Sequence, residues 1–234
     1  PMYRLLALAL SLTLLHAQAD ESVIRKTLGE RYPGIVIQSV TPTPMAGVWE
    51  VWTGGRLVYT DNTGEYLLLG TLVETRGKTN LSQQRLNALR AVKFDSLPLD
   101  KSFTVVKGKG ERRLAVFTDP DCPFCRRLEQ ELVKLDNLTV HVFLYPLADL
   151  HPHAPQIARN VWCAADRAQT WSAYMLEGKT PAAVDDCQAP IEEIAALAAR
   201  LGVEGTPAIL FGNGRRVDGY IPAHEIEALL QQGS

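Results

Sequence analysis

The residues of this sequence best suited to chemistry are two cysteines, Cys122 and Cys125, separated by Pro123 and Phe124. A strand-like run ends at Thr118, and a proline suits the first turn of a helix, where its missing N–H has no intrahelical acceptor anyway. Cys122 is therefore expected at the N-terminus of that helix. The unpaired backbone N–H groups and the helix dipole at this end favour a thiolate over a thiol. The sequence thus predicts that Cys122 is a nucleophile at neutral pH.

Cys125 is the predicted partner of this nucleophile. It begins a series of apolar residues at helical spacing, continued by Leu128, Leu132 and Leu135, which defines the buried face of the helix. One exposed sulfur of low pKa beside one buried sulfur is the arrangement that disulfide exchange needs, because the first attacks and the second releases the mixed disulfide. We therefore expect thiol:disulfide exchange, with Cys125 as the resolving thiol.

A purely structural disulfide and half of a zinc site are the alternatives for this pair. Zinc usually takes two such pairs or nearby histidines. Cys163 and Cys187 stand apart and form no second pair of this spacing, so zinc is disfavoured. Asp149, His151 and His153 have a spacing that could hold a metal, but neighbouring prolines indicate an irregular loop with solvated histidines. The sequence therefore predicts no metal site.

Charged residues flank the cysteine pair on both sides. Arg126 and Arg127 follow it and could stabilise a Cys122 thiolate further. Asp119 and Asp121 precede it and could relay a proton, although acidic residues in a turn before a helix usually cap the helix or improve solubility. We expect both aspartates to cap the helix or to improve solubility, and not to relay a proton.

The first 19 residues have the pattern of a secretory signal peptide. Arg4 precedes an apolar run from Leu5 to Leu15, which is too short to cross a bilayer, and Ala17-Gln18-Ala19 is a small-x-small cleavage pattern. We expect export to an oxidising compartment, where disulfides persist. The formal net charge of −2 comes from 24 basic and 26 acidic residues without blocks of like charge, so the sequence does not indicate nucleic-acid binding.

The remaining chain divides into three predicted parts. Residues 20–79 form an α+β domain, which is marginal alone at this size, so pairing with a second copy is expected. Residues 80–96 form a linker helix with apolar residues at helical spacing. Residues 97–234 form an α/β domain with a helical insertion. The strands are predicted at 35–37, 48–52, 57–59 and 66–69 in the first domain, and at 103–106, 114–118, 139–144 and 208–211 in the last.

The order of these features resembles a thioredoxin fold: a strand, a C-x-x-C motif that opens a helix, an inserted helical region, and Thr206-Pro207 before a strand. More narrowly, the chain from residue 20 onward resembles the DsbC and DsbG group of bacterial periplasmic disulfide isomerases. The segments Phe117–Asp119, Asn160–Ala164 and Gly202–Pro207 match this group. One difference is Pro-Phe between the cysteines, where the best-known isomerase has Gly-Tyr and the DsbG type has Pro-Tyr. These two residues tune the redox poise.

The resemblance implies a V-shaped homodimer joined through the N-terminal domains, with a cleft that holds misfolded disulfide-containing exported proteins. It implies that Thr206-Pro207 is a cis peptide which binds substrate together with Pro123 and Phe124. It also implies a structural disulfide between Cys163 and Cys187. A DsbD-type membrane reductase would keep the active pair reduced, and no bound cofactor is required.

The sequence therefore predicts a periplasmic thiol:disulfide oxidoreductase, a protein disulfide isomerase that reshuffles incorrect disulfides in exported proteins. A DsbG-like reductase of sulfenylated cysteines is the first alternative. A holdase chaperone that uses the dimer cleft and a copper(I) carrier that uses the dithiol are two others. Thiolates bind copper(I) well, but none of the three methionines lies near the pair in sequence. A holdase would keep its activity without Cys122.

Overall fold

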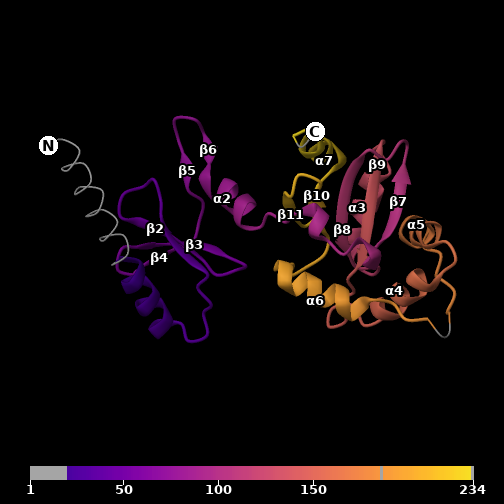
Figure 1. Ribbon diagram of the computed structural model, residues 1–234, viewed down its shortest axis with the longest axis horizontal. Helices are drawn as coiled ribbons and strands as arrows, with labels where there is room; N and C mark the ends of the chain where they lie inside the picture. Colours follow the sequence, from indigo (N-terminus) through magenta and orange to yellow (C-terminus); the bar gives the residue numbers. More distant parts are fainter. Residues whose placement is uncertain (1–19, 185–186, 233–234) are drawn as a thin grey trace. The chain divides into compact units, whose positions relative to one another are not determined.

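The structure is a computed structural model that describes residues 20–184 and 187–232. The expected signal peptide, residues 1–19, lies outside the described residues. The chain divides into two compact units, of which the first ends at Leu86 and the second begins at Asn87 (Figure 1). Within the described residues, no helix combines the length and the apolar composition that crossing a bilayer requires.

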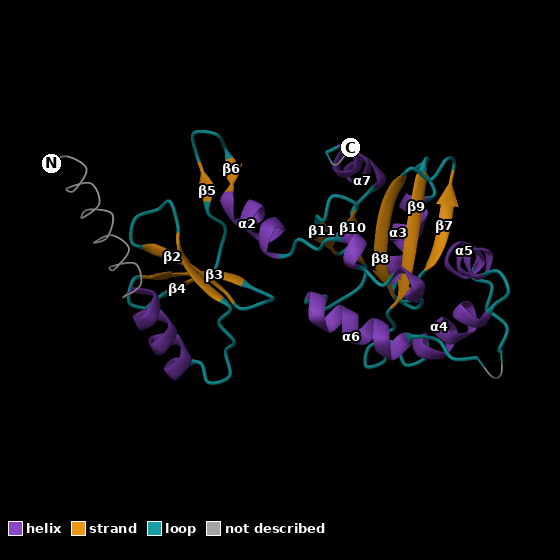
Figure 2. Ribbon diagram, in the orientation of Figure 1, coloured by secondary structure: helices purple, strands orange, loops and turns teal. Residues whose placement is uncertain are grey.

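The first unit is a small antiparallel sheet packed against a helix over residues 20–31 (Figure 2). Its four strands lie in chain order: β1 Ser39–Pro42, β2 Val48–Trp52, β3 Leu57–Asp61 and β4 Leu67–Leu68. Helix and sheet meet in a core of five buried residues, Ile24, Leu28, Val40, Trp49 and Val51. Such a small core stabilises a unit of this size only weakly.

The first strand begins later than the sequence predicts. A strand was expected at 35–37, whereas β1 covers Ser39–Pro42. The backbone groups before β1 find local partners instead: the Ile35 N–H donates to the Tyr32 carbonyl at 3.0 Å, and the Ile37 carbonyl accepts from Arg25 Nη1 at 2.9 Å. These groups are satisfied without a neighbouring strand, which is why the apolar run does not join the sheet.

A hairpin of β5 (Val73–Glu74) and β6 (Thr79–Asn80) leads into helix α2 (Leu81–Leu89). An ion pair joins Arg85 of this helix to Glu50 of β2. A hydrogen bond joins Ser82 to Tyr59 of β3. The beginning of α2 is therefore held by the sheet of the first unit.

Helix α2 is shorter than the predicted linker helix, which was expected to extend to residue 96. The helix ends at Leu89, and the N–H of Val92 donates to the carbonyl of Gly214 at 2.9 Å. The side chains of Val92 and Phe94 are buried in the core of the second unit. Because Val92 and Phe94 pack into that core, the chain leaves the helical path after α2.

The second unit contains a five-stranded sheet with the strand order β11-β10-β8-β9-β7. The central strands β8 and β9 are parallel, and every other pairing is antiparallel. The strand bounds are β7 Phe103–Lys107, β8 Arg112–Thr118, β9 Leu138–Leu144, β10 Ala208–Phe211 and β11 Arg216–Asp218. The strands predicted in this part of the chain are thus confirmed to within two residues.

Helices cover both faces of this sheet (Figure 2). Leu114 and Val116 of β8 face one core, and the alternating Ala115 and Phe117 face the other. The first core also contains residues of α3, α4, α5 and α7, and the second contains residues of α6. The helix bounds are α3 Pro123–Leu132, α4 Ala154–Cys163, α5 Arg167–Glu177, α6 Ile191–Leu201 and α7 Ala223–Gln231. Burial on both faces makes the end of β8 a rigid support for the residues that follow it.

Candidate active site

The two candidate cysteines lie where a central strand of the second unit meets a helix. β8 ends at Thr118, and α3 begins at Pro123 with Cys122 as its N-cap residue. The intervening turn is closed by the Cys122 N–H, which donates to the Asp119 carbonyl at 3.2 Å. The Cys122 carbonyl in turn accepts from the Arg126 N–H at 3.1 Å. Cys122 therefore lies at the positive end of the α3 dipole, as the sequence predicts.

The pKa of Cys122 is lowered to about 5. The largest cause is a hydrogen bond from the Cys125 thiol. The backbone N–H groups of Cys125 and Phe124 and the Thr206 side chain act in the same direction, whereas burial opposes them. Cys122 is therefore a thiolate at neutral pH.

The two arginines after the pair are engaged elsewhere, so the prediction that they stabilise the thiolate is wrong. Arg126 donates to the backbone carbonyls of Tyr174 and Met175 at 3.1 and 3.0 Å, at the end of α5. The guanidinium of Arg127 lies 4.4 Å from the ring centroid of Tyr220. Neither side chain is among the main causes of the low pKa of Cys122.

Burial raises the pKa of the Cys125 thiol far above its ordinary value, and its hydrogen bond to Cys122 acts in the same direction. Its Sγ accepts from the backbone N–H of Asp119 at 3.5 Å, and its side chain packs with Leu128 and Leu132. Cys122 is also largely covered, with 5% of its surface exposed against 1% for Cys125. The prediction of an exposed nucleophile is therefore wrong, because Cys122 is nearly as buried as Cys125. The two cysteines differ mainly in the pKa of their thiols.

The segment before β10 covers the Cys122 sulfur. The Thr206–Pro207 peptide bond is cis, and the Thr206 carbonyl oxygen lies 3.5 Å from Cys122 Sγ. The Pro207 carbonyl accepts from the Gly219 N–H at 2.7 Å, which fixes this segment against the following hairpin. On the helix side Phe124 keeps 53% of its surface exposed. The fold thus brings Thr206 and Pro207 to Cys122, which lies more than 80 positions earlier in the sequence.

Polar side chains around the active-site turn form a network that the sequence reasoning missed. Asp119 is completely buried and accepts from His151 Nδ1 at 2.9 Å, so it is not a solubilising residue and His151 is not a freely solvated one. Asp121 accepts from the Tyr174 hydroxyl at 2.6 Å. Burial, followed by the hydrogen bond to Asp121, raises the pKa of Tyr174 to about 12. The sequence separations are large, and no local pattern in the sequence indicates these pairs.

The other two cysteines form a disulfide, Cys163–Cys187, with a sequence separation of 24. It joins the end of α4 to the segment before α6 and packs against the core that contains Cys125. The Cys187 carbonyl also accepts from Arg159 Nε at 3.1 Å. This bond ties together the helical insertion that carries Tyr174.

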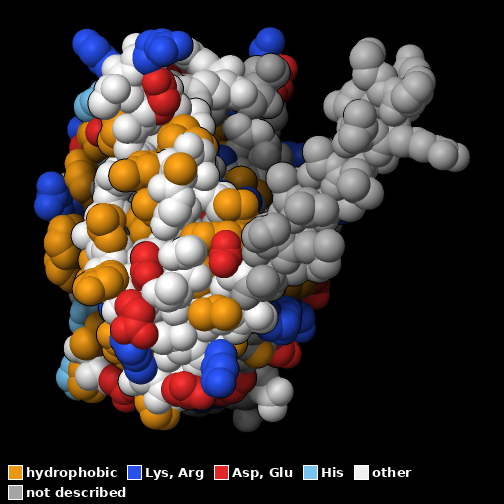
Figure 3. Space-filling view, turned by 90° about the vertical axis from the view of Figure 1, so that its left-hand side faces the viewer, with side chains coloured by type: hydrophobic (Ala, Val, Ile, Leu, Met, Phe, Trp, Pro, Cys, Tyr) orange, Lys and Arg blue, Asp and Glu red, His pale blue; other side chains and the backbone are white. Residues whose placement is uncertain are grey.

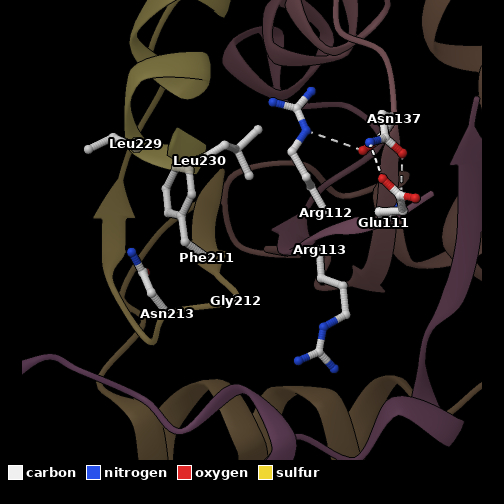
Figure 4. A pocket seen from close by; sticks show the side chains of 9 residues that line it. All are labelled: Glu111, Arg112, Arg113, Asn137, Phe211, Gly212, Asn213, Leu229 and Leu230. Carbon is white, nitrogen blue, oxygen red and sulfur yellow. Dashed lines mark hydrogen bonds between the residues drawn. The ribbon is translucent and has the colours of Figure 1, made fainter. Parts of the chain in front are cut away.

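A cavity of about 500 Å³ is lined by residues at the start of β8 and at the end of β10 (Figure 4). Its walls include Arg112 at the start of β8, whereas Cys122 follows the end of that strand. The six residue steps from Arg112 to Thr118 span about 20 Å of extended chain, so the cavity and the cysteines lie at opposite ends of β8. No residue predicted for the active site lines this cavity.

The two parts of the chain match two different family models. Residues 99–234 match a thioredoxin-like domain, and residues 15–83 match the N-terminal domain of disulfide bond isomerase proteins. These matches confirm the fold class expected from the sequence for both parts.

Curated relatives and a solved structure extend this likeness over most of the chain. A probable thiol:disulfide interchange protein DsbC of Bordetella parapertussis is 39% identical over 213 residues, which are 91% of this chain and 74% of the relative. The thiol:disulfide interchange protein DsbC of Escherichia coli K12 is 30% identical over 219 residues, 92% of this chain and 89% of the relative. A disulfide interchange protein of Neisseria gonorrhoeae is 42% identical, with a TM-score of 0.56 over 58% of this chain and 98% of that structure.

Proposed function

The chain belongs to the DsbC family of thiol:disulfide interchange proteins, and we propose that it isomerises and reduces incorrect disulfides in exported proteins through Cys122 and Cys125. The observation that carries the proposal is that the pKa values of the two thiols are displaced in opposite directions, that of Cys122 to about 5 and that of Cys125 upward. At neutral pH one sulfur is ready to attack, and the other keeps its proton until a mixed disulfide has formed.

The chemistry has one common step and two ways to finish. The Cys122 thiolate attacks one sulfur of a substrate disulfide, so that a Cys122–substrate bond forms and the other substrate sulfur leaves as a thiolate. In isomerisation, another substrate thiolate then attacks the mixed disulfide, a new substrate disulfide forms, and Cys122 is released without net electron transfer. In reduction, Cys125 loses its proton and attacks Cys122, which leaves two reduced substrate thiols and a Cys122–Cys125 disulfide.

The surroundings of Cys122 support contact with an extended, partly unfolded substrate. Phe124, two residues after Cys122, offers an exposed aromatic ring, and the backbone carbonyl of Thr206 contacts the Cys122 sulfur. Backbone groups at the end of a strand can pair with an incoming chain without regard to its side chains. We assign substrate binding to Thr206, Pro207, Phe124 and the adjacent Pro123.

A homodimer formed through the first unit is part of the proposal. The described residues of this unit expose many large apolar side chains, and its core is small. Hydrophobic side chains are also spread over the face of the protein seen in Figure 3. Apolar surface on this scale is typical of association with another chain. The exposed residues are Val23, Tyr32, Val36, Met45, Tyr66, Leu68, Leu69 and Val73.

We place this activity in the periplasm, after removal of residues 1–19. The Cys163–Cys187 disulfide supports an oxidising compartment, because such bonds do not persist in a reducing cytosol. In that compartment Cys122 and Cys125 need a source of electrons after each reduction of a substrate. We assign this role to a DsbD-type membrane reductase, which would deliver two electrons through its own dithiol.

The alternatives from the sequence are less well supported. A copper(I) carrier would bind the metal through two thiolates, whereas burial keeps Cys125 protonated. Reduction of sulfenylated cysteines would use the same Cys122 thiolate, but the relatives named DsbC favour disulfide interchange. A holdase would not need the thiolate at all.

Refolding of a scrambled multi-disulfide protein tests the proposal. The wild-type protein, added at substoichiometric concentration in a glutathione buffer, should accelerate recovery of the native disulfides. The Cys122→Ala variant should lose this activity. The Cys125→Ala variant should keep part of the isomerase activity and lose the reductase activity, since only reduction requires the resolving thiol. Equal refolding by the Cys122→Ala variant would favour a holdase instead.

A further inference from the structure

His151 and Asp119 are paired beside the dithiol, although they are 32 residues apart in sequence. The Asp119 carboxylate is completely buried and accepts three N–H groups: Oδ1 from Asp121 at 2.8 Å, and Oδ2 from Leu147 at 2.7 Å and from His151 Nδ1 at 2.9 Å. Carboxylate oxygens accept hydrogen bonds, so the ring nitrogen that contacts Oδ2 carries a hydrogen. His151 is thus held in a fixed orientation with Nδ1 protonated.

Asp119 connects this histidine to both cysteines. Its backbone N–H donates to Cys125 Sγ at 3.5 Å, and its carbonyl accepts the Cys122 N–H at 3.2 Å. The His151 side chain keeps 24% of its surface exposed, so its ring can exchange a proton with water. A titrating group with access to solvent is therefore hydrogen-bonded to Asp119, whose backbone contacts both cysteines.

The charges around His151 favour its protonated form. The hydrogen bond to Asp119 is the largest cause of a raised His151 pKa, and the charges of Asp119, Cys122 and Asp121 add to it, while burial opposes them. The interaction between Cys122 and His151 is mutual: a thiolate favours the imidazolium, and an imidazolium favours the thiolate. Tyr174 donates to Asp121, and Arg126 donates to a backbone carbonyl at the end of α5. No described hydrogen bond joins Tyr174 or Arg126 to His151.

We propose that His151 is a positioning residue for the dithiol, whose ring is charged while Cys122 is a thiolate and loses its proton more readily once Cys122 and Cys125 are joined in a disulfide. This inference rests on the proposed exchange chemistry and deepens it. Reduction of the protein disulfide by a dithiol supplies two electrons and two protons. One proton stays on Cys125, Cys122 remains a thiolate, and the second proton is shared between His151 and water.

The first test uses the unmodified protein. The His151 ring is titrated by NMR in the oxidised protein and in the protein reduced with dithiothreitol, and its signal is assigned with the His151→Gln variant. Loss of the thiolate charge on oxidation should lower the His151 pKa by about half a unit, the effect of one screened unit charge at short range. Identical titration in the two redox states would overturn the proposal.

The second test measures alkylation of Cys122 at two pH values. Without the imidazolium, the Cys122 pKa in His151→Gln should rise by about half a unit, which slows alkylation about twofold at pH 5 and leaves it unchanged at pH 8. A merely structural role would change the rate at both pH values. His153→Gln is the matched control, because His153 is exposed and makes no side-chain cap for α4. It should behave as the wild type at both pH values.

The outcomes separate this inference from the proposed function. If wild-type Cys122 shows no thiolate reactivity at pH 5, the exchange mechanism itself is wrong. If Cys122 is reactive but His151→Gln equals the wild type at pH 5, the exchange mechanism stands and the role of His151 is refuted.

Discussion

Lowering the pH from 7.5 to 5 should distinguish Cys122 from an ordinary thiol. The pKa of Cys122 is about 5, against 9.0 for an unperturbed cysteine. Only the thiolate reacts with an alkylating agent. The rate for Cys122 should therefore fall about twofold over this range, while that of an ordinary thiol falls about 300-fold with its thiolate fraction.

The absolute rates provide a second check. At pH 5 the thiolate fraction of Cys122 exceeds that of an unperturbed cysteine about 5,000-fold, but a thiolate of lower pKa is intrinsically less nucleophilic, here by about 40- to 100-fold. The net advantage of Cys122 at pH 5 is then about 50- to 100-fold. At pH 7.5 the same reasoning gives about equal or slightly slower reaction, so an assay at neutral pH alone would miss the effect.

The assay is iodoacetamide labelling of the reduced protein with mass-spectrometric identification of the modified cysteine. Cys122 should be labelled first at every pH, and Cys125 should stay unmodified because burial keeps it a thiol. Cys125→Ala removes the largest cause of the low Cys122 pKa and should slow labelling at pH 5, whereas Cys125→Ser retains a donor and should slow it less. A 300-fold fall of the Cys122 rate between pH 7.5 and 5, or faster labelling of Cys125, would refute the reasoning.

Three further predictions concern stability and assembly. Replacing Cys163 and Cys187 together by Ala should lower the free energy of unfolding by about 3.5 kcal/mol, because their disulfide closes a loop of sequence separation 24. The pH profile of Cys122 labelling should stay the same. An unchanged urea midpoint of unfolding would contradict this prediction. A truncation that begins at Asn87 should be a folded monomer in sedimentation that exchanges disulfides but isomerises poorly, since the first unit is missing; a dimer would show that the second unit associates by itself. Burial raises the pKa of Glu129, so the folded state disfavours its charged form and wild-type stability should fall as the pH rises above the ordinary pKa of 4.5. The Glu129→Gln variant keeps an acceptor for the Trp171 ring N–H and should lose this pH dependence of stability. If the melting temperatures of variant and wild type differ by the same amount at pH 5 and at pH 8, the prediction is wrong.

Local sequence patterns were sufficient for most of the second unit. The apolar spacing from Cys125 to Leu132 identifies the buried face of α3. The apolar runs Leu114–Phe117 of β8 and Val142–Leu144 of β9 are buried because both faces of the sheet are covered. These signals depend only on residues a few positions apart. The prolines at 123 and 207 likewise mark the start of α3 and the approach to β10.

Two predicted elements differ from the observed ones because their backbone groups bond to partners outside the predicted element. The apolar run at 35–37 has the composition of a strand, but its backbone bonds to Tyr32 and Arg25 instead. The predicted linker helix stops at Leu89 because Val92 bonds to Gly214. The contact between Val92 and Gly214 has no local signature, since the same residues could continue the helix if the distant partner were absent.

The sequence by itself determined which of the two sulfurs we propose as the nucleophile. The position of Cys122 before Pro123 places it at a helix N-terminus, and the apolar spacing after Cys125 buries the second thiol, so the identity of the nucleophile follows from local geometry. Only the tertiary structure decided what surrounds the two sulfurs. It places the Thr206 carbonyl on Cys122, draws Arg126 away to α5, and pairs the buried Asp119 with His151. The physical reason is that a pKa depends on burial and on charges within a few ångströms, and the fold brings those charges from loops that are far apart along the chain.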